Sequence, residues 1–186
     1  MSRELLEPGC AYHVYNHAVG SDRLFRNEDN YLYFLRRFQA FIPPIASTYA
    51  YCLMSNHIHF LVNVNEKIDI PANSKYSPEQ FVSKQFSNLF SSYTQALNKQ
   101  QRRMGNLFIS NFKRKKISDD EHLTTVIKYI HRNPVKHRAV KDLSTWKFSS
   151  YNAICSDAET FVAREEVLRW FGGVEEFRRC HELPES

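Results

Sequence analysis

The sequence has few residues that break regular structure, with only 5 glycines and 7 prolines among 186 residues. It also has no apolar run long enough to span a membrane, and its first residues lack the apolar core of a secretion signal. These absences argue against a loop-dominated, fibrous or membrane-embedded chain. We expect a globular protein in the cytoplasm, without a membrane partner.

Cysteine is scarce and scattered. The four cysteines are Cys10, Cys52, Cys155 and Cys180, and no two of them form a CxxC pair. This spacing argues against a zinc knuckle and against a dense disulfide framework. We expect free thiols in a reducing compartment.

Apolar and aromatic residues are plentiful. They make up 42% of the chain, with 14 phenylalanines and 10 tyrosines, which is typical of a packed core. A chain of this length usually forms one domain. We predict a main domain over residues 1–151 and a C-terminal helical appendage over residues 152–186.

The charge is unevenly distributed. The net charge is +5, yet residues 1–156 hold 21 of the 25 lysines and arginines and only 12 of the 20 acidic residues. A basic body with an acidic tail fits a polyanionic ligand, because lysine and arginine neutralise phosphates and release their counterions. Many basic proteins bind no nucleic acid, so charge alone does not decide the partner.

Hydrophobic periodicity predicts an alternation of strands and helices. Strands are expected at residues 11–19, 47–54, 57–64 and 106–117, and helices at 28–41, 78–100, 118–133 and 164–179. Ser118 and Glu121 have the spacing of a capping box that opens the third helix, and Pro134 is expected to end it. The order β-α-β-β-α-β, followed by a helix, predicts an α+β fold with a ferredoxin-like antiparallel sheet and packed helices.

His57 and His59 lie on the third predicted strand. Side chains alternate between the two faces of a strand, so both imidazoles point the same way. Two imidazoles on one face can hold a divalent metal ion and leave positions open for substrate oxygens. Two histidines on a wet sheet face are the more frequent meaning of this spacing, so a metal site needs a further ligand.

The helix predicted after Ser118 offers that ligand. Beside its apolar stripe lie Tyr129 and Asn133, which are neighbours on one face because residues four apart stack on a helix. The amide oxygen of Asn133 can complete a metal site begun by His57 and His59, with Tyr129 in reach of whatever the metal holds. Tyr129 can equally be an ordinary boundary tyrosine, and the residues alone leave both interpretations open.

The chemistry shows why these residue types belong together. A tyrosine hydroxyl has a pKa near ~10, so it must be deprotonated before it attacks. A divalent ion polarises a scissile phosphate and stabilises the charge that develops on its oxygens. Attack by the phenol oxygen of Tyr129 would give a phosphotyrosine and keep the bond energy, so that a strand could later be rejoined.

A basic run precedes this helix in the sequence. It consists of Lys113, Arg114, Lys115 and Lys116. We predict that these side chains bind DNA phosphates near the site. The usual meaning of such a run, a solvated charged edge strand, remains the alternative.

The same residues carry a resemblance to a known family. The chain resembles the single-tyrosine HUH transposases, and within them the REP-associated tyrosine transposases. Residues 54–62 (MSNHIHFLV) are similar to the HUH strand, and residues 129–135 (YIHRNPV) to the signature of the catalytic tyrosine. Residues 12–14, 22–25, 105–108 and 146–151 match further blocks in order. Two departures are Ser55, where the family often has proline, and residues 137–139, which lack a glycine.

This resemblance implies an HUH transposase-like domain that cleaves single-stranded DNA with Mg²⁺ or Mn²⁺ and forms a 5′-phosphotyrosine link. It implies that His57 and His59 are metal ligands, Tyr129 the nucleophile and Asn133 the third ligand. It also implies a DNA hairpin near the cleavage site as a partner.

Several alternatives stay open at this point. A domesticated protein that binds DNA hairpins without turnover is one, and a phosphodiesterase that uses activated water is another. The sequence also leaves open whether the protein is a monomer or a homodimer, whether Tyr129 serves its own subunit, which metal is used, and which hairpin is bound.

Overall fold

The computed structural model describes residues 4–182. The main elements are β1 (Ala11–His17), α1 (Glu28–Phe41), β2 (Ala46–Leu53), β3 (His57–Val64), α2 (Pro78–Gln101), β4 (Lys113–Lys116) and α3 (Asp120–Lys136). A short 3-10 helix, η1 (Leu143–Thr145), follows, and then α4 (Tyr151–Ile154), α5 (Arg164–Phe171) and α6 (Val174–Glu182). The predicted order of strands and helices is confirmed.

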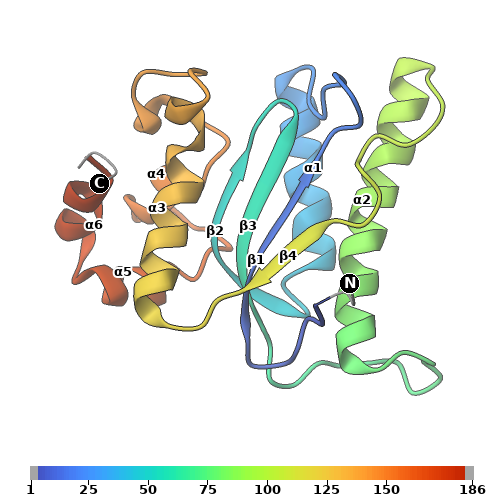
Figure 1. Ribbon diagram of the computed structural model, residues 1–186, viewed down its shortest axis with the longest axis horizontal. Helices are drawn as coiled ribbons and strands as arrows, with labels where there is room; N and C mark the ends of the chain where they lie inside the picture. Colours follow the sequence, from blue (N-terminus) through green and yellow to red (C-terminus); the bar gives the residue numbers. More distant parts are fainter. Residues whose placement is uncertain (1–3, 183–186) are drawn as a thin grey trace.

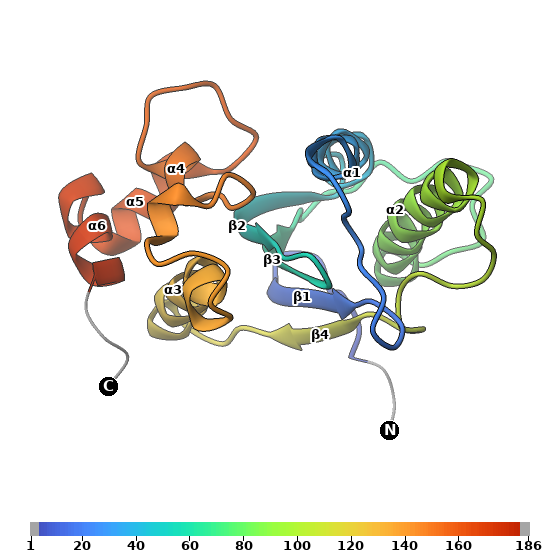
Figure 2. The ribbon, with the colours of Figure 1, turned by 90° about the horizontal axis from the view of Figure 1, so that it is seen from above.

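The four strands form one antiparallel sheet in the order β2-β3-β1-β4. This is the ferredoxin-like arrangement, so the predicted α+β fold is confirmed. Helices α1 and α2 cover one face of the sheet, and α3 lies on the other face (Figures 1 and 2). Helix α3 packs on β2 and β3, and in the described part of the chain no helix covers the same face of β1 and β4 (Figure 2).

The core between the sheet and helices α1 and α2 is aromatic. Phe38 stacks on Phe60 of β3 with ring centroids 4.4 Å apart, and Phe34 meets Tyr93 of α2 edge to face at 5.0 Å. All four side chains are buried. Burial of this apolar area is the main force that fixes the helices on the sheet.

Strand β4 is shorter than predicted. Regular pairing with β1 begins only at Lys113, and the segment over residues 105–112 meets β1 and the residues after it through a single bridge and a few backbone bonds, such as Ile109 N–H to the His17 carbonyl. Gly105 and Asn111 adopt left-handed backbone conformations, with φ of 90° and 66°. These conformations interrupt the extended geometry, so the prediction of a strand over 106–117 is wrong in its first part.

Helix α3 begins one residue later than the capping-box prediction. Its N-cap is Asp119, whose carboxylate accepts the backbone N–H of His122 at 2.7 Å. The Ser118 hydroxyl donates to the Asp119 carboxylate instead of capping the helix. A carboxylate at the N-cap also complements the positive end of the helix dipole, which favours this register.

Pro134 does not end α3, which continues to Lys136. Proline cannot donate to the carbonyl four residues earlier, that of Ile130. The side-chain amide of Asn133 lies 3.5 Å from that oxygen and donates to it. Because another donor serves the carbonyl, the helix can keep its last turn, and the predicted end was wrong for this reason.

The C-terminal part forms two helices where one was predicted over 164–179. Gly172 and Gly173 separate α5 from α6, with φ of 82° and 117°. Helix α6 packs on α3, where His181 Nε2 lies 2.9 Å from His131 Nδ1 in the buried interface. The segment after residue 151 therefore contacts the helix that holds Tyr129 and Asn133.

Two expectations from composition can be compared with the described residues. No helix within residues 4–182 is both long and apolar enough to cross a bilayer. The four cysteines are free thiols, with Cys52 buried and the other three half-buried.

Candidate active site

His57 and His59 lie where the strand alternation predicts. Both point to the face of the sheet that α3 covers, while Ile58 and Phe60 point into the core beneath α1. The two imidazole rings are 5.1 Å apart, and each residue is only 4% exposed. The two histidines are therefore a desolvated pair of imidazoles rather than part of a wet sheet surface.

Asn133 completes this arrangement from the last turn of α3. Its side-chain oxygen lies 3.4 Å from His57 Nε2, and its side-chain nitrogen donates to the carbonyl of Tyr129 at 2.8 Å. That donation to a carbonyl fixes the orientation of the amide, so the oxygen must face the histidine. The predicted meeting of an amide and an imidazole is observed.

The contact between His57 and Asn133 depends on which ring nitrogen of His57 carries the proton. A neutral imidazole carries one N–H, and His57 Nδ1 lies 2.8 Å from the side-chain oxygen of Asn56. In the tautomer that places the proton in this shorter contact, the lone pair on Nε2 faces the lone pairs of the Asn133 oxygen. Two acceptors that face each other in a buried place are stabilised by a cation between them.

The spacing of these two atoms also fits one metal ion. Ligands that each lie about 2.1 Å from a cation are themselves roughly 3.0 to 3.4 Å apart at octahedral or tetrahedral angles. The 3.4 Å between His57 Nε2 and Asn133 Oδ1 falls in this range. His57, His59 and Asn133 therefore fit a small divalent ion in donor type and, for this pair, in spacing.

Among residues 4–182, no three His, Cys, Asp or Glu side chains are grouped so as to hold a metal ion. The candidate site has two imidazoles, and its third protein ligand would be the amide of Asn133. Such a ligand set leaves coordination positions for substrate oxygens.

Tyr129 lies one turn before Asn133 on α3, and its ring packs against histidines of the sheet. Its ring meets His59 edge to face at 5.5 Å and His13 at 5.9 Å, and it is half-buried. The ammonium of Lys136 lies 5.0 Å from the centre of the same ring. This positive charge therefore lies over the face of the Tyr129 ring.

Burial keeps the histidines neutral. It lowers the pKa of His57 to about 4 and that of His59 to about 2, and neighbouring histidines add to both shifts. Burial likewise lowers the pKa of His13 to about 4, with repulsion from Lys115 and His122 as further causes. Near neutral pH these side chains therefore carry the lone pairs that a metal ion needs.

Strand β1 brings histidines to the site that spacing on β3 could not reveal. His13 Nε2 lies 2.9 Å from His59 Nδ1, and His17 stacks on its paired residue His57 at 5.0 Å. His137, just after α3, lies 4.8 Å from His57, ring centre to ring centre. The signal was present as His13-x-Tyr15-x-His17, a period-two pattern on the strand that the ferredoxin-like order sets beside β3.

The basic strand is divided between two faces. Lys113 and Lys115 pair with Tyr15 and His13, so they share the face of the candidate site. Arg114 turns to the other side, where it donates to Ser83 of α2 at 2.7 Å and lies over the ring of Phe112. Lys116 also turns away and forms an ion pair with Glu7. The structure thus brings two of the four predicted DNA-binding side chains to the face that holds Tyr129.

Known proteins resemble this chain in sequence and in fold. The chain matches no family model. A curated protein of Haemophilus influenzae named as a REP-associated tyrosine transposase is 31% identical over 106 residues, which are 56% of this chain and 58% of that protein. The alignment thus spans little more than half the length of the relative.

A solved structure extends the likeness to the fold. It is that of a REP-associated tyrosine transposase bound to a REP hairpin, and it matches with a TM-score of 0.64 over 87% of this chain and 88% of that chain. The identity is 16%, so this match shows a shared fold. The sequence likeness and the shared fold together support the resemblance to the REP-associated tyrosine transposases seen in the motifs.

Proposed function

We propose that this chain cuts and rejoins single-stranded DNA, with Tyr129 as covalent nucleophile and His57, His59 and Asn133 as ligands of a divalent metal ion. The observation that carries the proposal is the 3.4 Å contact between His57 Nε2 and Asn133 Oδ1, with the Tyr129 ring packed on His59.

The reaction is a phosphoryl transfer. The phenol oxygen of Tyr129 attacks phosphorus and loses its proton, the bond from phosphorus to the 3′ oxygen breaks, and that oxygen takes up a proton as a free 3′ hydroxyl. The product is a 5′-phosphotyrosine. Attack by a 3′ hydroxyl on this link reverses the step and releases Tyr129, so strands can be rejoined without another energy source.

The metal ion, Mg²⁺ or Mn²⁺, would polarise the scissile phosphate and offset the charge on its oxygens. His57, His59 and Asn133 would hold it. His13 keeps His59 oriented through the 2.9 Å contact, and Asn56 does the same for His57. Lys136 stabilises the negative charge that develops on the phenol oxygen of Tyr129.

The substrate strand would lie on the face of β1 and β4 that no described helix covers. Its floor carries His13, Tyr15 and His17, and Lys113 and Lys115 stand on the same face. These lysines supply phosphate contacts beside Tyr129. The fold match to a protein bound to a REP hairpin supports a hairpin as part of the substrate.

One chain supplies every part of this site. Tyr129 contacts the ring of His59 of its own chain. This contact supports attack by the tyrosine of the same subunit. A homodimer is then not required to complete the site, although it remains compatible with it.

The test is a denaturing gel. The protein is incubated with hairpin oligonucleotides from the flanks of its own gene, each with a single-stranded extension, in the presence of Mn²⁺. We expect a covalent protein-DNA adduct that disappears with chelator and in Tyr129→Phe. If Tyr129→Phe cleaves normally, a water-activated phosphodiesterase replaces the proposal. If the wild type binds the hairpins and cuts none of them, the protein is a hairpin binder without turnover.

A further inference from the structure

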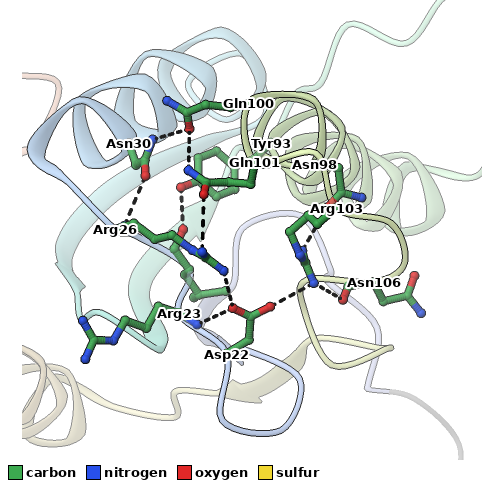
Figure 3. A network of polar contacts seen from close by, with 11 residues as sticks. Asp22, Arg23, Arg26, Asn30, Tyr93, Asn98, Gln100, Gln101, Arg103 and Asn106 are labelled. Atoms are coloured by element: carbon green, nitrogen blue, oxygen red, sulfur yellow. Dashed lines mark hydrogen bonds and ion pairs between the residues drawn. The ribbon is translucent and has the colours of Figure 1, made fainter.

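Two loops rich in arginine meet at one end of the fold, beside the turn between β2 and β3 (Figures 1 and 3). We call residues 22–26 and 102–106 the arginine loops. Asp22 joins them, since its carboxylate pairs with Arg103 at 2.9 Å and with Arg26 at 3.2 Å. The two loops therefore form one surface, although 75 residues or more separate them in the sequence.

The second loop is held in one conformation. Asn98 accepts from Arg103 at 2.9 Å and donates to the carbonyl of Gly105 at 2.9 Å, and Arg103 also donates to the carbonyl of Asn106 (Figure 3). These bonds tie the loop to the last turns of α2. A loop held in this way presents its exposed side chains without a large loss of conformational entropy on binding.

Arg102 occupies a position that usually carries glycine. It is the C-cap of α2 and has a left-handed backbone conformation, with φ of 51°. A side chain at this position strains the backbone, and asparagine or glycine would relieve the strain. Its presence in an exposed place points to a use for the arginine side chain outside the fold.

The arginine loops carry an excess of positive charge. Asp22 divides its single charge between Arg26 and Arg103. Arg23 and Arg102 are exposed and have no ion pair with any residue between 4 and 182. Figure 3 shows the Arg23 side chain extending away from the network around Asp22.

Met104 stands at the tip of the second loop. It is 93% exposed, more than any other large apolar side chain of the described chain. Polar residues would be expected at such a tip. An exposed apolar side chain next to arginines is an arrangement by which proteins pack against bases where a duplex ends or unstacks.

We propose that Arg23, Arg102 and Met104 form a grip for the stem of a DNA hairpin. The two arginines bind phosphates of the stem, and Met104 packs against the last base pair or an unpaired base. This inference rests on the proposed function and deepens it by naming the surface that recognises the hairpin.

The first arginine loop, which carries Arg23, lies next to the candidate active site. The first arginine loop is bonded to the turn just before His57, through Leu24 N–H to the carbonyl of Ser55 at 2.7 Å, and the neighbouring Ala18 N–H bonds to the carbonyl of Asn56 at 2.8 Å. A stem bound to the grip would thus direct its single-stranded extension toward His57 and Tyr129. This placement explains how one protein could recognise a hairpin and cut beside it.

The test is a binding titration in the presence of chelator, so that cleavage plays no part. The probe is a fluorescent hairpin with a single-stranded extension, taken from the flanks of the gene, and the affinity is measured at several salt concentrations. For the double variant Arg23→Gln/Arg102→Gln we expect at least a tenfold loss of affinity and a salt dependence reduced by about two phosphate contacts. For Met104→Gln we expect a loss of about threefold to tenfold with an unchanged salt dependence.

A matched control removes the same charge elsewhere. Lys84 lies in the first turns of α2, at the opposite end from Arg102, and Lys67 lies in the segment between β3 and α2. Both are exposed, and Lys67→Gln/Lys84→Gln should bind the hairpin as the wild type does. Equal affinity and salt dependence in the arginine variant and the wild type would overturn the grip and leave the proposed cleavage intact. Absence of hairpin binding by the wild type would overturn the grip, whereas an adduct at Tyr129 would still support the cleavage chemistry.

Discussion

The side-chain oxygen of Asn133 lies 3.4 Å from Nε2 of His57 in a buried contact between α3 and β3. The same amide donates to the carbonyls of Tyr129 and Ile130, which supports the helical turn that contains Pro134. Under the proposed function Asn133 thus has two roles, one toward the metal ion and one toward the helix that carries Tyr129. Substitutions of Asn133 can separate these two roles.

Asn133→Asp keeps an oxygen toward His57 and loses the donor toward Ile130. We predict that it binds Mn²⁺ at least as tightly as the wild type, whereas Asn133→Ala binds at least tenfold more weakly. Both variants should lose about 1–3 kcal/mol of stability, because the carbonyl of Ile130 loses a donor in a buried place. Electron paramagnetic resonance of Mn²⁺ and urea unfolding measure the two effects. Equal Mn²⁺ affinity in Asn133→Ala and the wild type would remove Asn133 from the ligand set.

His13 is expected to orient His59 through their 2.9 Å contact. We predict that His13→Ala weakens Mn²⁺ binding by about 10- to 100-fold, because partners of metal ligands commonly have effects of that size. His13→Gln, which can keep a hydrogen bond to His59, should recover part of the affinity. Thr125→Ala, at an exposed position on α3, is the control and should leave it unchanged. If His13→Ala and His13→Gln bind Mn²⁺ with the same affinity as the control variant, His13 has no part in the site.

The alternation along β4 predicts that its basic residues are not equivalent. Lys113→Gln/Lys115→Gln should weaken binding of single-stranded DNA and reduce its salt dependence by about two contacts, because both lysines share the face of Tyr129. Lys116→Gln removes a charge that is paired with Glu7 on the other side and should have little effect. Fluorescence anisotropy at several salt concentrations decides this. A larger effect of Lys116→Gln than of the double variant would mean that the DNA binds on the opposite face of the sheet from Tyr129, which would contradict the prediction.

The contact between α3 and α6 should make stability depend on pH. Burial lowers the pKa of His181 to about 4, from an ordinary value near 6.5. The unfolded chain therefore binds a proton more readily, so this stability is present above pH 6.5 and is lost as the pH falls from 6.5 toward 4. We predict a loss on the order of 2–3 kcal/mol from this residue between pH 7.5 and 4.

Urea unfolding at the two pH values tests this. The His181→Gln variant should show a smaller loss of unfolding free energy between pH 7.5 and 4 than the wild type. His122→Gln is the control and should keep the pH dependence of the wild type. An identical loss in all three proteins would mean that His181 does not contribute to the pH dependence of the free energy of unfolding.

The sequence predicted the fold well where one physical signal dominated. The period-two pattern on β3 and the apolar stripe on α1 predicted both elements at their observed bounds. The errors lie where several weak effects compete. Asp119 instead of Ser118 caps α3, and the Asn133 amide lets the helix pass Pro134, and neither contact can be read from propensities.

The sequence predicted the four central residues of the candidate site but did not predict the surrounding histidines of β1. His57, His59, Tyr129 and Asn133 follow from strand and helix periodicity together with the family resemblance. His13 and His17 become visible only when β1 is placed beside β3. The division of β4 between two faces likewise requires its pairing with β1, because the run of four basic residues looks uniform in the sequence.

The central claim is that Tyr129 becomes bonded to DNA through a 5′ phosphate. The most direct measurement is mass spectrometry of the adduct formed with a hairpin substrate and Mn²⁺, after digestion with trypsin and nuclease. We predict a nucleotide phosphate on the peptide that contains Tyr129, and none in Tyr129→Phe. A phosphate attached to any other residue, or free 5′-phosphate ends without an adduct in both proteins, would contradict the claim.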